Sequence, residues 1–154
     1  MKQLLCILTF LLFTNSLLAS FIYVPMSAEN QQNHLKAYGI VFFSLQKKIK
    51  AKWLLNYDGG AFLIEHSESV VNECKIRGVS YQVISGAKAQ LILEDISSPS
   101  KNQDAVTLEK APKIAVYSPK DKMPWDDAVT MVLKYAEIPF DVIYDEEVLS
   151  DKLL

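Results

Sequence analysis

The chain has 154 residues, of which 50% are hydrophobic and 22% are charged, and its formal net charge at pH 7 is −2. This length is enough for one ordinary domain with its own core. The mildly acidic balance, without a basic stripe, argues against nucleic acid as a partner.

The first twenty residues have the features of an export signal. Lys2 gives a positive start, residues 4–13 form an apolar run, and Ala19 and Ser20 are small. We therefore expect a signal peptide over residues 1–20, cleavage near Ala19 or Ser20, and a periplasmic or secreted protein. The alternative is an uncleaved anchor, because residues 4–24 carry no charge and could cross a bilayer. We expect membrane contact only through this segment.

Cleavage would change the composition of the protein in two ways. Loss of Lys2 leaves 15 basic and 18 acidic residues, a formal charge of −3. Loss of Cys6 leaves Cys74 as the single cysteine, so we expect no internal disulfide.

Runs rich in β-formers alternate with runs of helical period in the first half of the mature chain. The pattern predicts strands over residues 21–24, 53–57, 61–64 and 81–84 and helices over about 28–49, 67–77 and 87–96. This alternation is typical of an α/β fold with a mostly parallel sheet. We therefore predict an N-terminal α/β domain over residues 21–96.

A glycine pair separates the second and third of these strands. Asp58-Gly59-Gly60 suits the positive φ angles of a tight hairpin turn. The functional alternative is a binding loop, in which paired glycines let backbone amides approach an anion.

The second half of the chain begins with a polar stretch. Residues 97–111 are rich in Ser, Pro and charged side chains and are expected to be a linker between two domains. Beyond it, a strand over 113–117, a helix over 124–137 and a strand over 140–144 predict a β-α-β unit, followed by a further helix. Because two strands cannot bury both faces of a parallel sheet, we expect this second domain, residues 112–154, to be incomplete. A natural carboxyl end at Leu154 is the alternative.

Ligands of open α/β sheets bind where loops leave the carboxyl ends of the strands. This rule makes the loops after three predicted strands the candidate ligand-binding site, for a small polar ligand or a protein segment. The candidates are Asn56, Asp58, Gly59, Gly60, Ser118, Lys120, Asp121, Asp145 and Glu146.

Catalytic and metal-binding patterns are weak in this sequence. Cys74 is the sole candidate nucleophile, with His34 or His66 as its base, but it falls within a predicted helix and a buried position in the core explains it better. His66, Glu68 and Cys74 match no zinc spacing. We therefore predict no catalytic residue, metal or cofactor within this chain.

Several stretches resemble a family of exported bacterial proteins labelled asparagine synthetase B. The matching stretches are NHLKAYG (33–39), WLLNY (53–57), ISSPS (96–100), PKIAVY (112–117), PWDDAV (124–129) and IPFDVIYDEEVL (138–149). The unit that begins at Lys113 also looks like the opening of a flavodoxin-like, class I amidotransferase-like domain. The resemblance implies a longer, glutamine-hydrolysing protein whose catalytic residues lie downstream of Leu154.

Two classes of function follow from these patterns. The first is the N-terminal part of an amidotransferase-like enzyme, with its nucleophile outside this chain. The second is a binding or interaction module, for which an exposed apolar patch around Tyr57 and Phe62 is expected.

Overall fold

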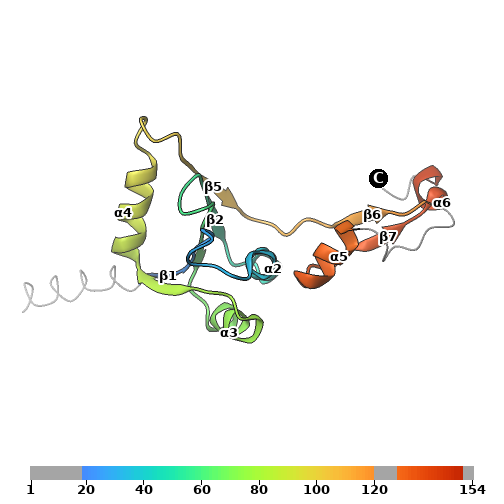
Figure 1. The fold of residues 1–154 in the computed structure, drawn as a ribbon, viewed down its shortest axis with the longest axis horizontal. Helices are drawn as coiled ribbons and strands as arrows, with labels where there is room; N and C mark the ends of the chain where they lie inside the picture. Colours follow the sequence, from blue (N-terminus) through green and yellow to red (C-terminus); the bar gives the residue numbers. More distant parts are fainter. Residues whose placement is uncertain (1–18, 120–127, 151–154) are drawn as a thin grey trace, which may run out of the picture.

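The computed structural model describes residues 19–119 and 128–150. Within these ranges the chain forms two units (Figure 1). The first, called here the sheet domain, contains β1 (Ser20–Val24), α2 (His34–Gln46), β2 (Ala51–Leu55), β3 (Phe62–Glu65), α3 (Glu68–Arg77), β4 (Gln82–Ser85), α4 (Gly86–Ile96) and β5 (Asp104–Leu108). The second, called here the small lobe, contains β6 (Ala115–Tyr117), α5 (Ala128–Tyr135), β7 (Asp141–Ile143) and α6 (Asp145–Leu149).

The five-stranded sheet has the order β4-β1-β3-β2-β5, and every neighbouring pair is antiparallel. The prediction of a mostly parallel, flavodoxin-like sheet is therefore wrong. The crossover units β1-α2-β2 and β3-α3-β4 do form, but β3 lies between β1 and β2, and β1 lies between β3 and β4. The strands of each crossover are parallel without being neighbours. This β-α-β-β-α-β arrangement is the split, ferredoxin-like topology.

Helices cover both faces of this sheet. In Figure 1, α2 and α3 lie on one side of the strands and α4 lies on the other. Alternate residues of β1 reach the two layers: Ile22 and Val24 pack with the core under α2 and α3, and Tyr23 packs with the core under α4. Since both faces are buried at the centre of the sheet, the central strands β1 and β3 are mostly apolar along their length, a pattern that is also typical of parallel sheets.

Phe62 lies at the centre of the core under α2 and α3. Its side chain is 2% exposed, is stacked with Trp53 at 6.1 Å between ring centroids, and meets the edge of Tyr38 at 5.6 Å. The expected exposed patch around Tyr57 and Phe62 is therefore absent at Phe62, because this side of β3 faces the helices.

A fifth strand lies within the segment expected as a linker. Residues 104–108 form β5, which pairs along the whole of β2 from Ala51↔Leu108 to Leu55↔Asp104. As an edge strand it keeps polar side chains such as Asp104 and Thr107 exposed, so its sequence resembles that of a loop.

The helix α2 begins later than predicted because residues 27–33 form a turn. The amides of Asn30 and Gln31 donate to the Ser27 carbonyl. The Gln31 side chain is buried and donates to the Pro25 and Ser80 carbonyls, while the Ser80 amide donates to it. This amide bridge joins the chain after β1 to the chain before β4.

The small lobe contains the predicted strand-helix-strand unit. Its two strands are parallel, with Ala115↔Asp141 and Tyr117↔Ile143 in register. Its helix is described from Ala128 onward, and the predicted start at residues 124–127 lies outside the described residues. Nowhere in residues 19–119 and 128–150 is a helix both long and apolar enough to cross a membrane.

Candidate functional site

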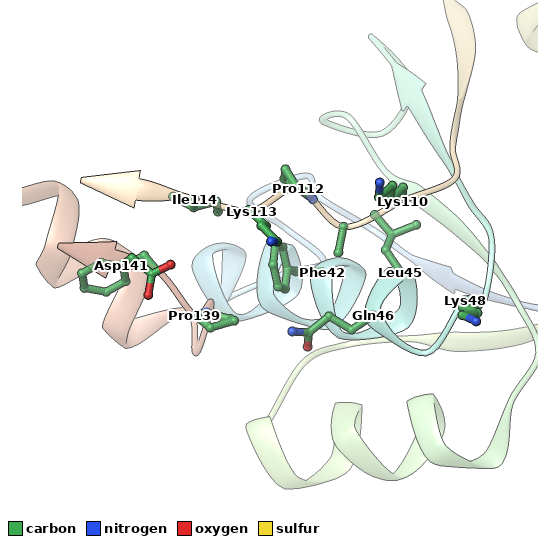
Figure 2. A pocket seen from close by; sticks show the side chains of 12 residues that line it. Phe42, Leu45, Gln46, Lys48, Lys110, Pro112, Lys113, Ile114, Pro139 and Asp141 are labelled. Atoms are coloured by element: carbon green, nitrogen blue, oxygen red, sulfur yellow. The ribbon is translucent and has the colours of Figure 1, made fainter. Parts of the chain in front are cut away.

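A groove of about 600 Å³ lies where the two units meet (Figure 2). One wall is the C-terminal half of α2, the second is the connection between β5 and β6, and the third is the chain that enters β7. The described residues that line it are Phe42, Leu45, Gln46, Lys48, Lys110, Ala111, Pro112, Lys113, Ile114, Pro139, Phe140 and Asp141.

The lining combines an apolar floor with a basic rim. Phe42 and Leu45 are each 8% exposed and belong to the side of α2 that faces the groove. Lys48, Lys110 and Lys113 are exposed around this floor. In Figure 2, Lys110 and Lys113 extend from the connection and Lys48 lies beyond the end of α2. Asp141 supplies the carboxylate of the described lining. Such a surface suits a ligand with an apolar body and a negative group.

The backbone conformation of Lys48 is left-handed, with φ 61°. The Ile49 amide donates to the Ser44 carbonyl at 2.9 Å, and the Lys48 amide donates to the Leu45 carbonyl at 3.0 Å. These bonds form a Schellman cap, whose left-handed position usually holds glycine. A lysine there costs roughly 1–2 kcal/mol in backbone strain.

The predicted binding residues between β2 and β3 have internal partners. Asp58 accepts a hydrogen bond from the Tyr23 hydroxyl at 2.6 Å, and the Asp58 carbonyl accepts one from the Met26 amide at 3.0 Å. Burial and this carboxylate raise the pKa of Tyr23. The Gly60 carbonyl accepts a bond from the Trp53 indole, and the Asn56 side chain donates to the Asn102 carbonyl. This geometry is that of a structural turn that holds two neighbouring segments.

We expect Gly59→Ala to destabilise the sheet domain by about 2 kcal/mol. Gly59 has φ 75°, and a Cβ there would lie 2.4 Å from the Met26 carbonyl oxygen. Thermal unfolding followed by circular dichroism measures the loss. Glu109→Ala, at an exposed position outside the turn, is the milder comparison. A Gly59→Ala protein as stable as the wild type would show that the turn is free to move.

The other predicted residues lie at the far end of the small lobe. The Ser118 amide donates to the Ile143 carbonyl at 2.8 Å, and the Tyr117 hydroxyl donates to Asp145 at 2.5 Å, which raises the pKa of Tyr117. Glu146 is exposed, and Lys120 and Asp121 lie outside the described residues.

The structure does not bring the predicted residues together in the groove. The groove lies at the amino ends of β6 and β7, beside Ile114 and Asp141, whereas Ser118 and Asp145 follow their carboxyl ends. The groove residues that sequence reasoning missed are Lys48, Lys110 and Lys113. A local signal exists for Lys110 and Lys113, because the Lys-Ala-Pro-Lys run over 110–113 places both lysines on a proline-stiffened connection.

Cys74 lies on the inner face of α3 and is fully buried, as the helical pattern predicts. Burial raises the pKa of its thiol to about 11, so the thiol is protonated at neutral pH. The candidate bases have other neighbours: His34 Nε2 is 3.1 Å from the Met26 carbonyl oxygen, and His66 Nε2 is 3.7 Å from Glu68 Oε1.

The contribution of Cys74 to the stability of the folded protein is expected to fall at alkaline pH. Its ordinary pKa of 9.0 applies in the unfolded chain and about 11 in the folded one. The unfolded chain therefore loses the proton first, so stability is full below pH 9 and is lost as the pH rises toward 11. Urea unfolding across this range measures the effect. Cys74→Ala is expected to show a smaller decline, and an equal decline in both proteins would contradict the assignment.

Among the described residues, no group of three or more His, Cys, Asp and Glu side chains is placed to hold a metal ion. Comparison with protein families, curated proteins and solved structures finds no match for this chain. The resemblance to the proteins labelled asparagine synthetase B therefore stays a prediction.

Proposed function

We propose that this protein is a binding module that holds a small organic anion in the groove between the sheet domain and the small lobe. The observation that carries the proposal is the arrangement of Lys48, Lys110 and Lys113 around the apolar floor at Phe42. The ligand class is a carboxylate, sulfonate or phosphate attached to an apolar or aromatic body.

Two forces act together on such a ligand. Its apolar body removes the exposed Pro112 and Pro139 beside the buried Phe42 from water, which contributes about 25 cal/mol per Å² of buried apolar surface. Its negative group interacts with lysines at a partly exposed rim, where each charge contributes roughly 0–1 kcal/mol and is screened by salt. Affinity should therefore decrease as salt is added without being abolished.

Asp141 restricts the choice of ligand. Its carboxylate lies in the same lining as the lysines and can accept a hydrogen bond from an amino or hydroxyl group. An anion that also carries such a donor is favoured over a simple dianion, which Asp141 would repel.

Titration with the aromatic sulfonate 8-anilinonaphthalene-1-sulfonate tests the proposal. Saturable binding to the folded protein, with a stoichiometry near one and weaker affinity at high salt, is the expected result. Phenylalanine and phenyllactate serve as competitors that combine a carboxylate with a donor group. The uncharged parent, N-phenyl-1-naphthylamine, is the matched control for apolar binding alone. Equal affinity for the charged and uncharged probes would contradict a role for the lysines.

Export of the chain is a separate part of the proposal. β1 begins at Ser20, and the Ala19 carbonyl accepts a hydrogen bond from the Gly86 amide at 2.7 Å. A cleavage site near Ala19 or Ser20 is therefore part of folded structure, so cleavage would have to precede folding of β1. Amino-terminal sequencing of the protein from a periplasmic or secreted fraction tests this. A start near Ser20 is expected, and a cytoplasmic protein that retains residues 1–19 would contradict it.

A further inference from the structure

We infer that the small lobe docks on α2 through a latch formed by Gly39 and Glu137, and that docking assembles the groove. This inference rests on the proposed binding function. The groove needs both units, because Phe42 and Leu45 come from α2 and Pro139, Phe140 and Asp141 come from the small lobe. In Figure 1, α5 lies beside α2, and the two units are joined by one extended connection.

Glu137 is the charged half of the latch. Its carboxylate pairs with the Lys36 ammonium from α2 and with Arg77 Nε from α3, the latter at 3.3 Å. Arg77 is held in place, since its side chain is 9% exposed, pairs with Glu73 at 2.8 Å and lies over the Phe43 ring at 5.7 Å. The hydrogen bond from Lys36 keeps the pKa of Glu137 below its ordinary value, so its carboxylate is charged at neutral pH.

Glu137 has a backbone conformation that glycine adopts more readily than glutamate. The Ile138 amide donates to the Leu133 carbonyl at 2.9 Å and the Glu137 amide to the Lys134 carbonyl at 3.1 Å, which is a Schellman cap at the end of α5. Glu137 occupies its left-handed position, with φ 58°, where glycine is the usual residue. Contacts to Lys36 and Arg77 offset this strain only while the lobe is docked.

Gly39 is the steric half of the latch. A Cβ built at this position would lie 1.8 Å from the Ala136 carbonyl oxygen and 3.0 Å from its carbonyl carbon. The end of α5 can therefore approach α2 only where α2 has no side chain. Glycine weakens the middle of a helix, and this close approach of backbone explains why it stands within α2.

Gly39→Ala tests docking of the small lobe without unfolding the sheet domain. Alanine strengthens α2 as a helix, so the sheet domain is expected to stay folded, while the new methyl group displaces the small lobe. Backbone ¹⁵N relaxation of the full chain should give one rotational correlation time in the wild type. In Gly39→Ala the small lobe should tumble faster than the sheet domain, and affinity for 8-anilinonaphthalene-1-sulfonate should fall at least tenfold.

Glu137→Gly is the second variant, because glycine suits the left-handed backbone and removes the side chain that carries the carboxylate. It should also release the small lobe from α2, so the inference can still be tested if Gly39→Ala fails to fold. A Glu137→Gly or Gly39→Ala protein that tumbles as one body and binds the probe normally would overturn the inference while leaving the proposed function intact. Absence of probe binding to the wild type, with a lobe released in both variants, would instead overturn the proposed function alone.

Discussion

Phe62→Ala is expected to lower the free energy of unfolding of the sheet domain by about 3–5 kcal/mol. The ring is 2% exposed and lies on the central strand β3, between β1 and β2. Its removal leaves a cavity beneath α2 and takes away the ring contacts with Trp53 and Tyr38. Urea unfolding followed by circular dichroism measures the change in stability.

Val83→Ala is the control for this substitution. Val83 is also apolar and lies in the same sheet, but its side chain is 51% exposed on the edge strand β4. Its effect should stay within about 0.5 kcal/mol. A loss below about 1 kcal/mol for Phe62→Ala would mean that Phe62 is not in the core that the fold places around it.

Replacing Lys48, Lys110 and Lys113 together by glutamine is expected to weaken binding of 8-anilinonaphthalene-1-sulfonate roughly 10- to 100-fold at low salt. Each lysine contributes up to about 1 kcal/mol at an exposed rim, and each 1.4 kcal/mol is a factor of ten in affinity. The apolar floor at Phe42 is unchanged, so residual binding should lose its salt dependence.

The matched control replaces Lys75, Lys88 and Lys134, which lie on α3, α4 and α5 and outside the groove lining. It makes the same change in net charge. If both triple variants lost affinity equally, the anion would be responding to overall charge and not to the groove.

Except for β5 and the start of α2, the strands and helices of the sheet domain follow closely from local sequence. Apolar runs such as Ile22-Tyr23-Val24 and Phe62-Leu63-Ile64 predict strands, and Gly78 ends α3 in the left-handed conformation expected of a helix cap. The order of the strands in the sheet cannot be predicted from the local sequence pattern. Insertion of β3 between β1 and β2 depends on pairing across long stretches of chain, and both parallel and split arrangements need the same alternation of strands and helices.

The groove could not be predicted from the sequence for a related reason. Its lining comes from residues 42–48, 110–114 and 139–141, which are far apart in the sequence and are brought together only by the tertiary fold. By contrast, the Asp58-Gly59-Gly60 turn carries its own local signal, and its positive φ angles agree with the predicted reversal. What no pattern indicated was that Tyr23 and Met26 hold this turn from the neighbouring chain.

Mapping of backbone amide chemical shifts during titration with 8-anilinonaphthalene-1-sulfonate tests the central claim most directly. The account predicts that shifts concentrate at residues 42–48, 110–114 and 139–141, on both sides of the groove. Shifts concentrated at Asn56–Gly60 or around Ser118 and Asp145, with the groove unaffected, would contradict it.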